Sequence, residues 1–184
     1  MSAIGGHHHP QIRRGFTLIE ILVTLTVIAA LSVVIIPAFQ DDAQLRVMAA
    51  AAVLASDIEF AQVQSISQPN DRIIVQFDTA NSRYWLAYAD DPNSPLLRPD
   101  TGEPYLVEFG VDRGRAADDV SIWLVDVEDD RLSFDANGGM QDFTALPQII
   151  LGRNSQYRTL SVAASTGTIT ETEGAPEGWS PPTE

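Results

Sequence analysis

A single carboxylate, that of Glu20, stands inside a long apolar run near the N-terminus and is the residue best placed to do chemistry there. From Ile21 to Ile36 the chain has no charged residue, only aliphatic side chains interrupted by two threonines and a serine. An unpaired carboxylate in hydrocarbon costs on the order of several kcal/mol, so an ordinary membrane anchor gives no reason for this one. We therefore expect Glu20 to meet a cation in the functional protein.

The apolar run predicts a helix that spans a membrane. At about 1.5 Å per residue, a helix from Phe16 to Phe39 is roughly 36 Å long, which is enough to cross a bilayer core. Two arginines precede this run and two aspartates follow it. By the positive-inside rule the N-terminus is then cytoplasmic, and everything after Phe39 is outside the cytoplasm.

The stretch Gly15-Phe16-Thr17-Leu18-Ile19-Glu20, followed by an apolar helix, resembles the cleavage and methylation signal of type IV prepilins and of the pseudopilins of type II secretion systems. The resemblance implies that a prepilin peptidase cuts between Gly15 and Phe16 and that the new amine of Phe16 is N-methylated. It also implies that Glu20 serves assembly and that Pro37 kinks the helix. The implied partners are the peptidase, other pilins or pseudopilins, and an assembly platform in the bacterial inner membrane.

The physical argument points the same way, because a new terminal amine and a buried carboxylate are two charges that neighbouring helices can pair. We expect the carboxylate of Glu20 to meet the Phe16 amine of an adjacent subunit. A plain signal peptide is the first alternative, but its apolar core is only about 7 to 15 residues long and ends at an A-x-A-like site, which this stretch lacks. A simple uncleaved anchor is the second.

After the anchor, the residue pattern predicts more helix and then strands. Residues 43–67 contain no glycine or proline, and Leu54, Ile58 and Ala61 recur at helical spacing. Two alternating segments then predict a hairpin. With the further expected strands, these segments are 72–78, 83–89, 105–109, 120–127, 131–134, 148–151, 158–163 and 168–170. The predicted fold is α+β and pilin-like: a long N-terminal helix, from Phe16 to about Ser67, packed on antiparallel sheet.

Four segments are expected. The resemblance to prepilins implies that residues 1–15 are the leader and 16–39 the membrane and assembly half of the helix. The residue pattern predicts an extracytoplasmic α+β domain at 40–170 and a flexible acidic tail, rich in proline and glycine, at 171–184. A turn-rich loop with four prolines is expected from Asp90 to Pro104.

The order of long helix, hairpin, variable loop and further strands resembles the H-type minor pseudopilins and the FimT-like minor pilins. This resemblance implies a structural subunit of the periplasmic pseudopilus of a type II secretion system. One alternative is a minor type IV pilin that serves pilus assembly, adhesion or DNA uptake. Another is a membrane-anchored binding domain that uses the prepilin signal only for targeting.

Composition argues against several other functions. The chain carries a formal charge of −14 and has no cysteine, and its three histidines all lie in the expected leader. No histidine base, catalytic triad or zinc site is therefore expected in the mature domain, and we expect neither an enzyme nor a small-molecule substrate. Nucleic acid is disfavoured because the dense basic pair of Arg113 and Arg115 is flanked by aspartates.

The loop after the expected hairpin carries several candidate calcium ligands. Asp90, Asp91, Asn93, Asp100 and Glu103 offer hard oxygen ligands on one flexible segment, which is the kind of ligand that calcium prefers. Their spacing is not that of an EF-hand. A solvated acidic loop is the default interpretation, calcium binding is the alternative, and no other cofactor is expected.

Overall fold

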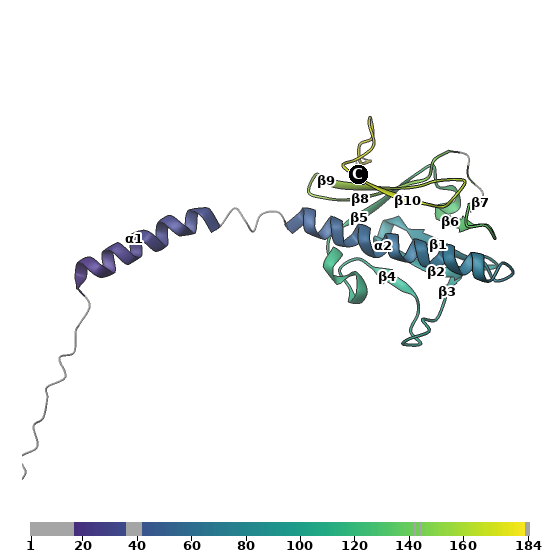
Figure 1. The fold of residues 1–184 in the computed structure, drawn as a ribbon, viewed down its shortest axis with the longest axis horizontal. Coiled ribbons are helices and arrows are strands. Elements are labelled where there is room, and N and C mark those ends of the chain that lie inside the picture. Colours follow the sequence, from purple (N-terminus) through teal and green to yellow (C-terminus); the bar gives the residue numbers. More distant parts are fainter. Residues whose placement is uncertain (1–16, 36–41, 142, 144, 183–184) are drawn as a thin grey trace, which may run out of the picture. The chain divides into compact units, whose positions relative to one another are not determined.

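The computed structural model describes residues 17–35, 42–141, 143 and 145–182, which belong to two compact units. The first unit ends at Gln40 and contains the helix α1 (Leu18–Ile35). The second runs from Asp41 to Glu184 and contains every other helix and strand (Figure 1). Its long helix packs on antiparallel sheets, so the predicted α+β class is confirmed.

The helix α2 (Asp42–Ser67) is the centre of the second unit, because one of its faces carries mostly apolar side chains, several of them small. Its buried residues recur every three or four positions and are Val47, Ala50, Ala51, Leu54, Asp57, Ile58, Ala61 and Ser65. The alanines let the sheets approach closely, and the helix ends shortly before Pro69. The expected continuity of α1 with α2, and the kink at Pro37, lie outside the described residues.

The first sheet begins with the predicted hairpin, which is confirmed. In it β1 (Ile73–Asp78) pairs antiparallel with β2 (Arg83–Tyr88), and Val75 lies opposite Leu86. The sheet has the order β3-β2-β1-β6-β7, and β4 also pairs with β2. The remaining strands are β3 (Asp91–Pro95), β4 (Leu106–Glu108), β6 (Arg131–Phe134) and β7 (Met140–Gln141).

The second sheet has the order β10-β9-β8-β5 and is also antiparallel. Its strands are β5 (Ser121–Val125), β8 (Gln148–Arg153), β9 (Gln156–Val162) and β10 (Ile169–Glu173). Short 3₁₀ helices connect the strands: η2 (Thr79–Asn81), η3 (Asp112–Ala117) and η4 (Glu128–Asp130).

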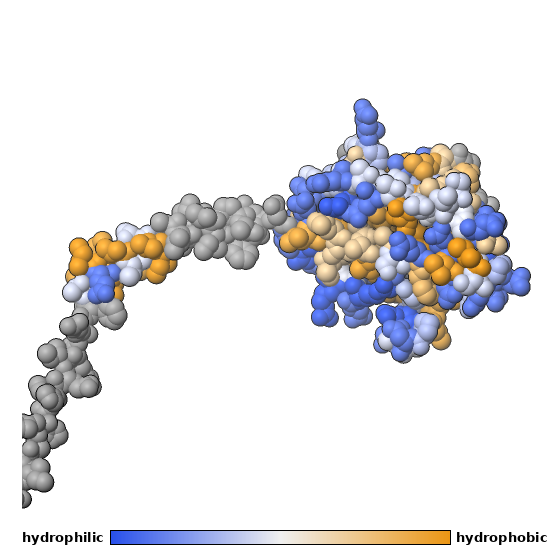
Figure 2. Space-filling view, viewed as in Figure 1, coloured by the Kyte–Doolittle hydropathy of each residue, from blue (hydrophilic) through white to orange (hydrophobic). Residues whose placement is uncertain are grey.

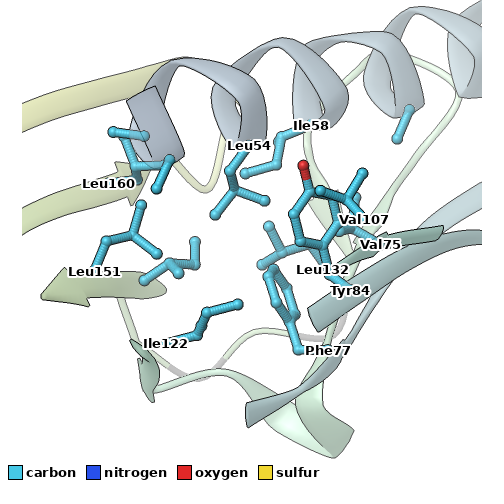
Figure 3. Close-up of a cluster of buried hydrophobic side chains, with 14 of the residues drawn as sticks. Leu54, Ile58, Val75, Phe77, Tyr84, Val107, Ile122, Leu132, Leu151 and Leu160 are labelled. Atoms are coloured by element: carbon cyan, nitrogen blue, oxygen red, sulfur yellow. The ribbon is translucent and has the colours of Figure 1, made fainter. Parts of the chain in front are cut away.

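One hydrophobic core joins α2 to both sheets (Figure 3). Leu54 and Ile58 point from the helix into this core and are fully buried. The first sheet contributes Val75, Phe77, Tyr84, Val107 and Leu132, and the second contributes Ile122, Leu151 and Leu160. Burial of this face, rather than helix propensity, accounts for most of the stability of α2.

Two expectations about the less regular segments need correction. The loop expected from Asp90 to Pro104 contains the edge strand β3, whose prolines are tolerated because an edge strand has one unpaired side. The acidic tail expected from residue 171 begins with the last three residues of β10. Further along, the Trp179 ring packs on Trp123 at 5.4 Å between centroids. Composition alone predicts disorder here, but pairing with β9 holds residues 171–173 on the domain, and the ring contact holds Trp179 there.

Candidate functional site

In the helix α1 the side chains of residues 18–29 are all exposed, and apart from Glu20, Thr24 and Thr26 they are apolar. Thr17 directly precedes the helix, and the N–H of Glu20 donates to Thr17 Oγ1 at 3.3 Å and to the Thr17 carbonyl at 3.1 Å. Leu18 is 84% exposed and Ile21 is 48% exposed, and the described part of the helix presents mostly apolar surface (Figure 2). A helix that is hydrophobic all round is typical of a membrane span or of the interior of a bundle.

The threonine hydroxyls of α1 need no external partner. Thr24 Oγ1 donates to the carbonyls of Glu20 and Ile21, both at 2.9 Å, and Thr26 Oγ1 bonds in the same way to Leu22 and Val23. A polar group satisfied within its own helix is compatible with lipid.

The carboxylate of Glu20 differs from these hydroxyls. It is exposed, and between described residues it makes no hydrogen bond or ion pair. Once lipid or protein covers α1, this charge needs a partner from outside the described part of the chain.

The sequence around this carboxylate matches a known N-terminal motif. Residues 11–36 match the family model described as the prokaryotic N-terminal methylation motif. The chain carries a prepilin-type N-terminus. This motif implies processing by prepilin peptidase and assembly with other pilins. No curated protein and no solved structure matches the chain.

The prepilin-type motif and the apolar helix within it together indicate a single-pass membrane anchor. Among the described helices, α2 is the one long and apolar enough to cross a membrane by length and composition, while α1 has a shorter apolar stretch, Leu18–Ala29. The packing of α2 decides against α2 as the anchor, because Leu54 and Ile58 are fully buried in the domain core. Gly15, Phe16 and Pro37, predicted for cleavage, methylation and the kink, lie outside the described residues.

The five calcium candidates belong to two different local structures. Asp91 and Asn93 are in β3, and Asp90 directly precedes that strand. Asp100 and Glu103 are in a turn closed by the Arg98 N–H, which donates to the Glu103 carbonyl at 2.8 Å; Arg98 also pairs with Asp100 at 2.9 Å. Among the described residues, no three acidic or histidine side chains form a group that could hold a metal ion. A solvated acidic loop stays the prediction, and calcium binding stays its untested alternative.

A buried polar cluster in the second unit was not predicted from the sequence. The Asp57 side chain is 0% exposed and accepts hydrogen bonds from Tyr84 Oη at 2.7 Å and from Tyr105 Oη at 2.9 Å. Arg113 pairs with the same carboxylate at 2.6 Å and also donates to Tyr105 Oη at 3.0 Å. The Asp57 cluster (Asp57, Tyr84, Tyr105 and Arg113) therefore ties α2 to β2, to the segment before β4 and to η3.

The same contacts correct the interpretation of Arg113 as part of a basic surface patch. Its guanidinium also lies 5.4 Å from the Tyr105 ring centroid, in cation–π geometry. Partial burial alone would lower the pKa of Arg113, but its hydrogen bond to Tyr105 and the charge of Asp57 raise it. Arg113 therefore completes an internal cluster. The carboxylate of Asp57 balances its positive charge, so Arg113 attracts a phosphate backbone only weakly.

The Asp57 cluster predicts a loss of stability at alkaline pH. Burial, and secondly the charge of Asp57, raises the pKa of Tyr84 well above 10 and also raises that of Tyr105. Tyrosine in the unfolded chain ionises near pH 10. The contribution of the raised pKa values to the free energy of unfolding is therefore fully present below pH 10 and is lost as the pH rises further. The chain has no lysine to titrate in the same range.

We expect the urea midpoint of the protein to fall between pH 9 and pH 11, and to fall less in Tyr84→Phe. Intrinsic tryptophan fluorescence measures this midpoint. Equal pH dependence in the two proteins would contradict the assignment.

One sequence signal could have revealed this cluster. Asp57 lies one residue before Ile58, on the apolar face that also includes Leu54 and Ala61. An acid on such a face must be paired when it is buried. Its partners are far away in sequence, however, and no local pattern identifies them.

Proposed function

We propose that this chain is a minor pseudopilin, a structural and non-catalytic subunit of the periplasmic pseudopilus of a type II secretion system. In this proposal α1 anchors the protein in the bacterial inner membrane, with the N-terminus cytoplasmic and the α+β domain periplasmic. The observation that carries the proposal is the methylation motif at residues 11–36, which contains an apolar helix whose one acid has no partner among the described residues.

Processing would create the missing cation. Cleavage after Gly15 removes Arg13 and Arg14 and leaves a free amine on Phe16. This amine keeps its charge after methylation, and Glu20 lies four residues further along the chain. The Glu20 carboxylate of one subunit then pairs with the Phe16 amine of the next, because burial of either charge alone is strongly unfavourable. This pairing fixes the axial step between subunits.

The arrangement of the domain supports the role of an H-type minor pseudopilin rather than that of the major pseudopilin, which forms the shaft of the filament. The chain has the long core helix, the first hairpin and the second antiparallel sheet in the order expected for that type. It also lacks a D-P-W-G-like segment, which is expected of the major pseudopilin. Partners in this proposal are the other pseudopilins and the inner-membrane assembly platform.

The decisive experiment is mass spectrometry of the N-terminus of the membrane-resident protein in its native host. We expect a chain that begins with N-methylated Phe16, and we expect the unprocessed form to accumulate when the peptidase gene is deleted. An intact Met1 terminus on the membrane-resident form would overturn the proposal.

The same N-terminal motif also serves type IV pili, so a minor type IV pilin is the second candidate. Purification of the tagged protein from its native host separates the two. Recovery with secretion-system pseudopilins supports the first candidate, and recovery in sheared surface pili supports the second.

A further inference from the structure

The outer face of the second sheet carries aromatic rings that the core does not use. Side chains alternate along a strand, so Ile149 and Leu151 of β8 face the core while Ile150 and Gly152 face away from it. Trp123 of β5 lies opposite Ile150 in the sheet register. Ile150 is nevertheless 0% exposed, so other parts of the chain cover this face.

The segment after β10 holds these rings in place. Trp179 packs edge-on against Trp123 at 5.4 Å and against Tyr157 at 5.7 Å between ring centroids. The Gly174 N–H donates to the Tyr157 carbonyl at 2.8 Å. At Gly152 an added Cβ would lie 2.4 Å from the Tyr157 ring and 2.9 Å from the Trp123 ring, so the close approach of these rings requires glycine. The aromatic surface is thus preorganised.

A polar rim borders these rings and forms a hollow of ≈ 440 Å³ with them. Its lining consists of Asp119, Ser121, Trp123, Gly152, Arg153, Asn154 and Tyr157. This volume lies within the range of about 300–1,000 Å³ that is usual for small-molecule sites. Asn154 and Ser155 have φ angles of 49° and 66°, as in the tight two-residue turns that join paired strands, so the rim rests on a rigid hairpin.

The charges of the hollow disfavour an anionic ligand. Arg153 lies 3.4 Å from both Asp42 and Asp119, so its positive charge already faces two carboxylates. An anion finds no surplus positive charge here, and the charge of −14 on the whole chain repels phosphate chains further. The hollow therefore offers a ligand two aromatic rings, together with hydroxyl, amide, carboxylate and guanidinium groups for hydrogen bonds.

We propose that this hollow, the Trp123–Tyr157 site, binds an uncharged oligosaccharide. A pyranose ring has an apolar face of C–H groups that can pack on the Trp123 and Tyr157 rings. Its rim of hydroxyls can bond to the polar groups of Asp119, Ser121 and Asn154, which offer both donors and acceptors. Trp179 is a positioning residue that holds both rings. Export of the domain, as proposed above, would bring the site to the glycan of the cell wall, whereas binding itself does not depend on export.

The test uses the full chain in a zwitterionic detergent that contains no sugar. The probes are a β-1,4-linked N-acetylglucosamine hexamer, which represents wall-type glycan, and an α-1,4-linked glucose hexamer. Calorimetric titration is the readout. We expect saturable binding of at least one hexamer, and a preference for the acetylated one would identify wall glycan as the source. Absence of saturable binding for both hexamers overturns the proposal.

Variants locate the binding. We expect Trp123→Ala to weaken binding at least tenfold and Asn154→Gly, which suits the positive φ of that turn, to weaken it several-fold. Trp85→Phe is the matched control, because Trp85 lies in the first sheet and donates to the Pro92 carbonyl. If Trp123→Ala does not fold, Asn154→Gly alone decides. Unchanged affinity in the folded variants would overturn the assignment. Failure here leaves the N-terminal processing result unaffected, so the two proposals are tested separately.

Discussion

Replacement of Asp57 by alanine is expected to lower the free energy of unfolding by about 3 to 5 kcal/mol, the range for removing one partner of a buried ion pair. The carboxylate is fully buried, and its removal leaves the hydroxyls of Tyr84 and Tyr105 without their acceptor. The side chain of Arg113 is 30% exposed and can turn partly to water, which places the expected loss near the lower end of this range. Urea unfolding of the full chain at pH 7, followed by tryptophan fluorescence, measures the change.

Two further variants make this result specific. Glu59→Ala removes an exposed acid two residues along the same helix and is expected to change stability by less than about 0.5 kcal/mol. Asp57→Asn keeps one acceptor but loses the charge that pairs with Arg113, so an intermediate loss is expected. Equal stability of Asp57→Ala and Glu59→Ala would contradict a role for the Asp57 cluster in holding α2 to the first sheet and η3.

Replacement of Glu20 by alanine is expected to reduce co-assembly with sister subunits at least tenfold while membrane insertion and processing continue. Without the carboxylate, the Phe16 amine of the neighbouring subunit would be buried without a partner. Removal of one partner of a buried ion pair costs about 3 to 5 kcal/mol, which corresponds to more than tenfold in association. Insertion does not need the acid, because the rest of α1 is apolar and its threonines are satisfied within the helix. Site-specific crosslinking between subunits in native membranes measures this assembly.

Thr24→Ala provides the matched control for Glu20→Ala. Its hydroxyl lies one turn further along α1 and already bonds to the Glu20 and Ile21 carbonyls. We expect this variant to assemble like the wild type. Glu20→Gln separates charge from hydrogen bonding, and the proposed ion pair requires it to be defective as well. Normal crosslinking of Glu20→Ala would refute the assembly role of this residue.

Several features could be predicted from the sequence because they depend on neighbouring residues. The prepilin-type motif is a contiguous string, the apolar character of α1 is a property of composition, and the hairpin of β1 and β2 follows from alternation around a short turn. The acid at position 20 is conspicuous because everything after it up to Ile36 is uncharged.

Other features were decided only by the tertiary structure. Tyr84 and Tyr105 lie 27 and 48 residues from Asp57, and the sequence alone suggested no contact between them. The strand β3 and the docking of Trp179 were likewise missed, because prolines and acidic residues there indicated loop and tail.

The physical reason is the range over which each interaction acts. Helical periodicity, strand alternation and a processing signal are encoded within a few residues. The partner of a buried carboxylate, or of an aromatic ring on a sheet, depends on which strands pair and in which register. By itself the sequence therefore determined the prepilin-type anchor and its isolated acid. The packing of α2 on the sheets decided the Asp57 cluster, and the pairing of β5, β8 and β9 with the docking of Trp179 decided the Trp123–Tyr157 site.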